Sequence, residues 1–360
     1  MKFTYRVVDI TYNEIMPSIV DYVNNSNIFT ARTMGRVKNW KGVNMQQPIR
    51  IANSTTGGSF DGLDSFDTST TNNTRVLTWY VKAYEQSVVI PGIEKAVNGN
   101  SEKQVLSLVA DRLDEAKESL SQDVGTLLYG IGADKDFDGL GIIVDDGTVS
   151  PTYGGLSRST TPGNAADVTA AGSGNISLAL IFSEFTAVSA AGAEKESPTI
   201  ALTTPTVWDL TETLLGNQLH ANYESTSIKG YNMVSGNTPN GVMVPAEEIK
   251  GAVGFNAISL RGRPMVADDK CTSGTFFWLN ERYIDFYRLI SSDLKQVSSA
   301  LEVTEGAGDT EARPSFLQLK DFMSPVNQFG EIGALIVMGN LICRAPRRQG
   351  KITGITGVAS

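Results

Sequence analysis

Histidine and cysteine are scarce in this 360-residue chain, which contains one histidine, His220, and two cysteines, Cys271 and Cys343. Imidazole is the commonest metal ligand in proteins and the usual proton carrier near neutral pH. Its scarcity therefore removes most metal centres and most acid–base catalysis built on histidine. Two cysteines beside small or apolar residues are typical of reduced thiols in a reducing compartment. We expect a protein that is not an enzyme and that holds no cofactor.

The chain also lacks an excess of basic residues and lacks long apolar runs. It has 30 Lys and Arg against 39 Asp and Glu, a net charge of −9. A protein that grips nucleic acid by its phosphates needs a basic face, so this balance argues against such a role. No stretch approaches the ~18 consecutive apolar residues of a membrane span, and the N-terminus has no apolar run of signal-peptide length. We expect a protein made and kept in the cytoplasm of its producing cell.

A long hairpin is predicted before the middle of the chain. Residues 42–74 are rich in Gly, Asn, Ser and Thr and lack the apolar density of a core. Residues 75–90 alternate in the manner of a strand. One face holds Leu77, Trp79, Val81 and Ala83, and the other holds Thr78, Tyr80, Lys82 and Tyr84. Extended arms of about 20 residues reach ~65 Å at about 3.3 Å per residue, well past a body whose radius of gyration is ~21 Å. The apolar face of such a hairpin needs a neighbouring subunit to cover it.

Residues 101–129 predict one long helix. Ser101 and Gln104 fit a capping box, and Gly130 and Gly132 end the pattern. The narrow apolar stripe indicates a helix that lies across a sheet. Its members follow at steps of three and four residues: Val105, Val109, Leu113, Ala116, Leu120, Val124 and Leu127.

The rest of the chain combines helix and strand patterns, which predicts a mixed α/β domain over 176–315 with further strands on either side of it. Helices are expected over 176–188 and 206–219. Strands are expected over 141–144, 262–267, 275–279, 316–322 and 334–344.

Two short turns complete a recognisable order of parts. They are Phe137-Asp138-Gly139-Leu140 and Tyr153-Gly154-Gly155-Leu156-Ser157-Arg158, placed after a helix ending LLYGIG and before a terminal CRAPRRQGKITGI. Over nearly the whole chain, this order resembles the major capsid protein of tailed bacteriophages of the Hong Kong 97 type. The resemblance implies an α+β fold with an N-terminal arm over 1–41 and an extended β-hairpin loop over 42–84. It also implies a peripheral domain, 85–175 with 316–360, that carries the spine helix 101–129, and an axial α/β domain over 176–315.

The resemblance also implies a function. Copies of the chain would form pentamers and hexamers of an icosahedral shell in the virion, assembled in the host cytoplasm around double-stranded DNA that is bound without sequence specificity. Implied partners are further copies, a portal and a decoration protein. Only about 40 residues precede the hairpin, where some relatives carry a longer scaffolding segment, so a separate scaffolding protein is expected. Alternatives are an encapsulin-like shell, another phage structural protein such as a tail protein, and an enzyme with an unfamiliar carboxylate site.

Subunit contacts are expected at the hairpin, the second turn and the basic end of the chain. The predicted interface residues are Trp79, Val81, Tyr84, Arg158, Arg347 and Arg348. A basic cluster of Arg344, Arg347, Arg348 and Lys351 leaves two interpretations open, contact with DNA phosphates or with acidic groups of a neighbour.

An acidic turn follows the long helix. Its acids, Asp134, Asp136, Asp138 and Asp145, match most of a calcium-binding loop. Gly141 stands where that loop needs a hydrophobic residue, and the exit segment is predicted as a strand. The alternative is a polar turn whose Asp side chains accept hydrogen bonds from the local backbone.

Overall fold

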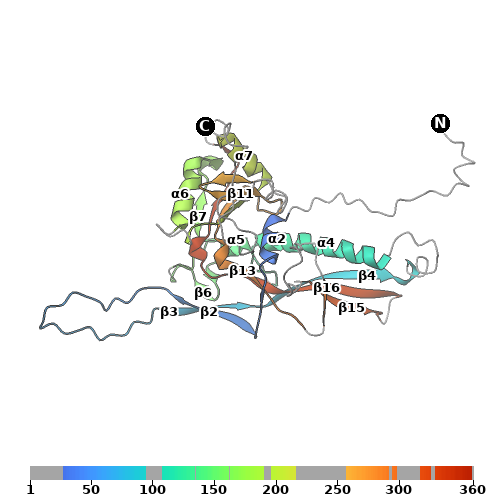
Figure 1. Cartoon of the computed structure of the whole chain (residues 1–360), viewed down its shortest axis with the longest axis horizontal. Coiled ribbons are helices and arrows are strands. Elements are labelled where there is room, and N and C mark those ends of the chain that lie inside the picture. Colours follow the sequence, from blue (N-terminus) through green and yellow to red (C-terminus); the bar gives the residue numbers. More distant parts are fainter. Residues whose placement is uncertain are drawn as a thin grey trace, which may run out of the picture.

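The computed structural model describes residues 27–94, 108–133, 135–161, 163–189, 196–215, 257–291, 294–297, 317–325 and 329–358. These residues build two six-stranded sheets, a long helix and a hairpin that projects from the body (Figure 1). The two free cysteines are both buried. Within the described part of the chain, no helix combines the length and the apolarity needed to cross a membrane.

The first sheet is centred on a long strand, β16. Over Gly330–Gly339, β16 pairs antiparallel with β4 on one edge, and β13 and β15 pair antiparallel along its other edge. The strands are β1 (Lys38–Asn39), β4 (Lys82–Pro91), β13 (Ile284–Arg288), β14 (Lys295–Val297), β15 (Leu317–Met323) and β16 (Gly330–Cys343).

The second sheet has the order β10-β11-β9-β12-β17-β7. Its central strands β9 and β12 are buried along their whole length, which accounts for the unbroken apolar run Phe276–Leu279. Two helices, α6 (Leu178–Val188) and α7 (Pro205–Leu215), pack on this sheet. The strands are β7 (Asp167–Ala170), β9 (Ile200–Thr203), β10 (Ile258–Leu260), β11 (Arg263–Ala267), β12 (Phe276–Leu279) and β17 (Gly350–Thr353).

The predicted long helix is confirmed as α4 (Leu108–Tyr129). It lies along β4 and β16 (Figure 1), and its buried side chains include Ala116, Leu120 and Val124 of the predicted stripe. The capping box at Ser101 and Gln104 lies outside the described residues. A narrow apolar stripe therefore did indicate a helix resting on a sheet.

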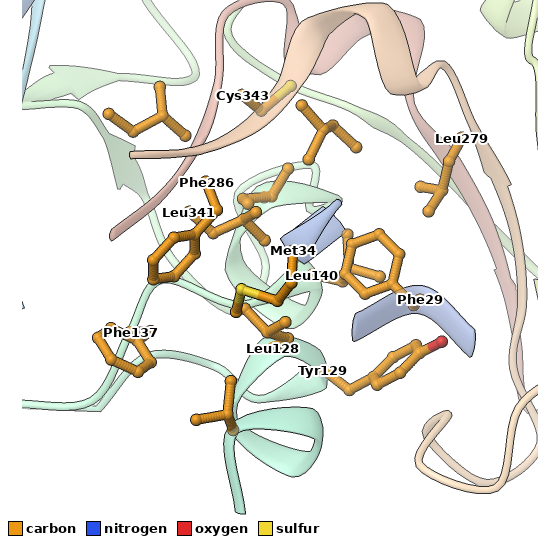
Figure 2. Packing of buried hydrophobic residues seen from close by; sticks show 14 of the residues in the cluster. Phe29, Met34, Leu128, Tyr129, Phe137, Leu140, Leu279, Phe286, Leu341 and Cys343 are labelled. Carbon is orange, nitrogen blue, oxygen red and sulfur yellow. The ribbon is translucent and has the colours of Figure 1, made fainter. Parts of the chain in front are cut away.

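The end of the predicted arm folds onto the body. The short helix α2 (Ile28–Met34) inserts Phe29 and Met34 into the main core (Figure 2). The Phe29 ring lies 5.5 Å from the ring of Tyr129 at the end of α4. Arg32 forms an ion pair of 2.7 Å with the buried carboxylate of Glu281. This end of the predicted arm is thus part of the folded body, where α2 packs against both α4 and β13.

The strand predicted over 141–144 is wrong, because this segment forms the short helix α5 (Leu140–Ile143). The backbone N–H of Val144 donates to the carbonyl of Leu140 at 2.9 Å. Gly139 and Gly141 lie directly against the backbone of Gly130, so the chain turns tightly around the end of α4. A run of only four apolar or small residues is too short for its periodicity to distinguish a strand from one turn of helix.

The other predicted elements are confirmed with shifted ends. The helix predicted from residue 176 begins at Leu178, because the Ser177 hydroxyl caps it by accepting from the N–H of Leu180 at 3.2 Å. Residues 216–219 of the second helix, and His220, lie outside the described residues. The short elements are β2 (Asn44–Arg50), β3 (Thr74–Tyr80), β5 (Thr152–Tyr153), β6 (Leu156–Ser157), η1 (Gly172–Gly174), β8 (Asn175–Ile176), η4 (Glu281–Tyr283), η5 (Pro346–Arg348) and β18 (Gly357–Val358).

Both sheets draw strands from more than one predicted domain. Strands β13 and β14, from the segment 176–315, pair in the first sheet with β16 and β15. Strands β7 and β17, from the segments 85–175 and 316–360, pair in the second sheet. The division of the chain into peripheral and axial domains stays a prediction.

Candidate functional site

The predicted hairpin is confirmed and projects from the body (Figure 1). Its strands β2 and β3 pair antiparallel from Asn44↔Tyr80 to Arg50↔Thr74. Beyond them, residues 51–73 form a tip that is almost entirely exposed. Three large apolar side chains in this tip face solvent, with exposed fractions of 64% for Phe60, 101% for Leu63 and 70% for Phe66. An apolar cluster on a projecting loop is a feature of contact surfaces.

The tip is also uniformly acidic. Residues 51–73 contain Asp61, Asp64 and Asp67 and neither Lys nor Arg. Each of these acids directly follows one of the exposed apolar residues, so the stretch FDGLDSFDT repeats apolar–Asp–any three times. Hydrogen bonds from Ser69 lower the pKa of Asp67, which favours its charged form. The three-residue repeat is visible in the sequence, but only a polar tip was predicted for this stretch.

The base of the hairpin is anchored in the main core. Leu77 and Trp79 on β3 are buried, and the Trp79 ring lies 5.9 Å from the ring of Tyr153 in an edge-to-face arrangement. The backbone N–H of Thr78 donates to the carbonyl of Gly154 at 2.9 Å. Gly154 has φ +58°, and a Cβ there would lie 2.8 Å from Leu77. The Tyr153–Arg158 turn thus supports the hairpin.

Arg158 holds that turn in place from inside the body. Its guanidinium donates to the carbonyls of Ile142, Asp145 (2.8 Å), Ser150 (3.1 Å) and Asn164 (2.7 Å). It also lies over the ring of Tyr153, 5.2 Å from the centroid. Burial lowers the pKa of Arg158. This network ties the turn beneath the hairpin to four backbone carbonyls.

A second polar cluster fixes the junction between the hairpin and β4. The Asp138 carboxylate accepts from Lys82 Nζ at 3.0 Å and from Asn340 Nδ2 at 2.7 Å. Asn340 Nδ2 also donates to the carbonyl of Tyr80 at 3.2 Å. The alternation predicted to run through Ala83 is wrong beyond Tyr80, because the strand is interrupted at Val81 and Ala83 is exposed.

Two acids of the predicted calcium loop, Asp138 and Asp145, make other contacts. Asp145 is buried and accepts from the backbone N–H groups of Gly147, Val149 and Ser150 at 3.0 to 3.2 Å. Asp138 is engaged as described above, Asp136 is exposed, and Asp134 lies outside the described residues. The part of the chain that the structure describes contains no group of three or more acidic, His or Cys side chains placed to hold a metal ion. For Asp145, the alternative of local backbone hydrogen bonds is confirmed.

The basic end of the chain lines a cleft at the hairpin base. Arg344 is paired with Asp285 at 3.1 Å and Arg348 with Glu196 at 2.9 Å, and Lys351 is buried. Arg347 is exposed. The cleft has a volume of about 280 Å³ and runs between the hairpin and η5. Its lining includes Ile49, Arg50, Leu77, Gly163, Glu196 and residues 344–348.

The six predicted interface residues therefore lie in three environments. Trp79 and Arg158 are buried within the chain itself. Val81, Tyr84 and Arg348 are half-buried, and the Tyr84 hydroxyl donates to Asp123 at 3.0 Å. Arg347 is exposed at the cleft. The structure brings Trp79, Arg158 and the cleft together around the hairpin base, and the contact of these residues with another copy stays a prediction.

Comparisons with known proteins identify this architecture. No family model and no curated protein matches the sequence. Among solved structures, the capsid asymmetric unit of cyanophage A-1(L) aligns over 98% of this chain and 100% of its own, with TM-score 0.69 and 14% identity. The capsid of a native GTA particle aligns over 98% and 96%, with TM-score 0.59 and 7% identity.

A third similar structure is an encapsulin complex. The holo-SrpI encapsulin complex from Synechococcus elongatus aligns over 100% of this chain and 98% of its own, with TM-score 0.52 and 10% identity. Likeness at these identities concerns the course of the backbone and extends over the full length of each chain. The projecting hairpin, the long helix and the two sheets together therefore give this chain the mixed α+β fold of phage capsid proteins.

Proposed function

We propose that this chain is the major capsid protein of a tailed bacteriophage, with the Hong Kong 97-type arrangement of parts. The observation that carries the proposal is the projecting tip with Phe60, Leu63 and Phe66 exposed. A monomer gains nothing by holding such side chains in water at the end of a hairpin. A neighbouring copy that covers them gains ~25 cal/mol per Å² of apolar surface removed from water.

When each copy's hairpin reaches a copy that does not reach back, the contact is head-to-tail. Such contacts close into rings when the rotation between copies is right. Rings of five and six copies are the pentamers and hexamers of an icosahedral shell. The anchored hairpin base supports this role, because a rigid root sets the direction in which the tip reaches its neighbour.

The two sheets suggest which elements form the peripheral domain and which form the axial domain. In this proposal, α4 with the first sheet forms the peripheral domain, and α6 and α7 with the second sheet form the axial domain. The predicted boundaries are then adjusted so that β13 and β14 belong to the first and β7 and β17 to the second. The role is structural, in the virion, after assembly in the host cytoplasm.

The shell would enclose double-stranded DNA without reading its sequence. The net charge of −9 and the pairing of Arg344 and Arg348 with acids fit a container wall better than a DNA-binding surface. A scaffolding protein, a portal and a decoration protein are the partners that this function requires or permits.

Expression of the full chain tests the proposal. Size-exclusion chromatography with light scattering and negative-stain electron microscopy should show hollow, megadalton spheres, with or without a co-expressed scaffolding protein. Uniform shells from the chain alone would remove the need for a scaffold. A stable monomer under both conditions, or tubes, would contradict the shell function.

An encapsulin-like compartment is the second candidate, favoured by the full-length likeness to the encapsulin complex. The contents of particles isolated from the producing cell separate the two. Phage DNA inside the particles supports the capsid, whereas a packaged protein without DNA supports the compartment.

A further inference from the structure

Asp-Gly pairs occur three times in this chain, at Asp61-Gly62, Asp138-Gly139 and Asp146-Gly147. An aspartate before glycine can rearrange readily, because the glycine amide carries no side chain that hinders its approach to the carboxyl group. We propose that the first pair, in the hairpin tip, is a site of spontaneous modification at which Asp61 converts to isoaspartate, and that the fold protects the other two pairs. The proposal does not depend on the shell function.

The reaction needs no partner except water. The amide nitrogen of the glycine attacks Cγ of the protonated carboxyl group, a Cγ–N bond forms, and the carboxyl OH leaves as water with the amide proton. Water then opens the resulting five-membered ring. Cleavage of the Cγ–N bond restores aspartate, whereas cleavage of the bond between nitrogen and the backbone carbonyl carbon gives isoaspartate. One water leaves and one enters, so the mass is unchanged and nothing is oxidised.

The geometry at the tip brings the reacting groups together. The N–H of Gly62 donates to Oδ1 of Asp61 at 2.8 Å, so the nucleophile lies beside the carboxyl group that it must attack. Both residues are exposed, and a Cβ at Gly62 would meet nothing within 4 Å. The further hydrogen bonds of Asp61 to described residues join its backbone to Asp64, at 2.9 and 2.8 Å. No packed neighbour therefore opposes the rotation that closes the ring.

The pair at Asp138 is held by the folded body. One carboxylate oxygen accepts from Lys82 Nζ at 3.0 Å, and the other accepts from Asn340 Nδ2 at 2.7 Å. A Cβ at Gly139 would collide with the carbonyl oxygen of Gly130, which shows how closely the two backbone segments pack. Ring closure at this pair would require the carboxylate to leave Lys82 and the turn to open.

The pair at Asp146 is exposed but has its groups directed elsewhere. The Asp146 carboxylate accepts from the hydroxyl of Thr148 at 2.6 Å and from its N–H at 2.9 Å. These hydrogen bonds lower the pKa of Asp146, which favours the charged form, from which oxygen does not leave as water. The N–H of Gly147 donates to the carboxylate of Asp145 at 3.0 Å, so the nucleophile faces a different side chain.

Isomerisation would alter the shape of the tip. It routes the backbone through the side-chain carbons of Asp61 and so lengthens the segment between Phe60 and Leu63, which are both exposed. If the tip joins copies as proposed above, aged chains should assemble less well than fresh ones. This consequence alone rests on the proposed function.

Peptide mapping of the aged, folded chain tests the inference. The full-length chain is incubated at pH 6, where carboxyl groups carry more protons than at pH 8, and is then denatured and digested with trypsin. The tip is released as one peptide, 51–75, and the two comparison pairs together as 136–158. Isoaspartyl peptides elute separately at the same mass, and electron-transfer fragmentation locates the altered residue. The Asn-Gly pairs at 98–99 and 240–241 lie on other peptides.

Peptide 51–75 should acquire a second form that is altered at Asp61. This form should accumulate roughly tenfold or more faster than any isomer of 136–158, because the latter pairs must first open locally. In guanidinium chloride, where the chain is unfolded, all three pairs should isomerise at similar rates. Equal rates in the folded chain would overturn the inference, as would a peptide 51–75 that isomerises only in guanidinium chloride.

Gly62→Val is the matched variant. Its side chain has room in the fold, and Gly62 does not have a positive φ. The branched side chain hinders the approach of the amide nitrogen, so the second form of 51–75 should be lost. Asp61→Asn should form isoaspartate faster than the parent, because an amide loses ammonia more readily than a carboxylate loses water. A second form that persists in Gly62→Val would place the change at another acid and overturn the inference.

Discussion

Arg158 is the residue on which the turn beneath the hairpin depends. It is buried and donates to four backbone carbonyls, and its charge lies 3.9 Å from the carboxylate of Asp145. We expect Arg158→Met to destabilise the unassembled chain by about 3–5 kcal/mol, because it leaves buried carbonyls and a buried carboxylate without their partner. Urea unfolding followed by tryptophan fluorescence measures the change.

Arg347 provides the matched control for that substitution. It is exposed at the cleft, so Arg347→Met should change the free energy of unfolding by no more than about 0.5 kcal/mol. Equal effects of the two substitutions would show that the Arg158 network does not stabilise the turn.

We expect Glu184 to make the stability of the chain depend on pH. Its side chain is buried in α6, and burial raises its pKa to about 7. One carboxyl oxygen accepts from Thr169 Oγ1 at 2.7 Å, and the other has no hydrogen-bond partner among the described residues. Because the folded-state pKa exceeds the unfolded value of 4.5, folding favours the protonated acid. The contribution is full below pH 4.5 and is lost as pH rises through 7.

Glu184→Gln should therefore remove this pH dependence. At pH 8 the variant should be more stable than the parent by on the order of 3 kcal/mol, and near pH 4 the difference should vanish. Urea unfolding at a series of pH values measures it. A parent chain whose stability does not fall between pH 5 and 8 relative to the variant would contradict the assignment.

At the scale of elements, Gly154 and Gly155 set the approach of the Tyr153–Arg158 turn to the hairpin. Both have positive φ, but a Cβ at Gly154 would collide with Leu77, whereas the space beside Gly155 is open. Gly155→Ala should cost about 1 kcal/mol of backbone strain. Gly154→Ala should cost about 1–3 kcal/mol more because Leu77 must move. Thermal unfolding of the pair measures the difference, and equal costs would place the strain in the backbone alone.

The long helix and the hairpin could be predicted from the sequence because their patterns are local. Steps of three and four residues mark α4, and a polar stretch before an alternating one marks the hairpin. The helix α5 could not, because four residues carry too little periodicity and its shape depends on Gly139 lying against the end of α4. Packing between distant segments also escaped prediction, as with α2 inserting Phe29 beside Tyr129.

The candidate site was predictable in outline only. The turns at residues 137–140 and 153–158 were recognised as motifs. Asn340, which joins Asp138 to the hairpin, was not, because it lies some 200 positions further along the chain. The basic cluster was read as a group of four cations. The structure shows two of them paired with acids and one buried, which sequence spacing does not reveal. The apolar–Asp repeat in the tip was readable from the sequence and was overlooked.

At the scale of the whole molecule, a folded body carries a projecting hairpin whose tip exposes both apolar and acidic side chains. The body buries its own apolar residues in two clusters, one around α4 and the first sheet and one beneath α6 and α7. The tip contributes to neither cluster. In the proposed shell, neighbouring copies would cover the exposed apolar side chains of the tip.

Removal of the tip tests this account most directly. Residues 54–70 are replaced by a short Gly-Ser turn, and the variant is compared with the parent by light scattering and negative-stain microscopy under conditions where the parent forms shells. We predict a variant with the parent's circular dichroism and unfolding midpoint that forms no shells, because the surface that joins copies is gone. Shells of the same size and number from the tipless chain would contradict the account.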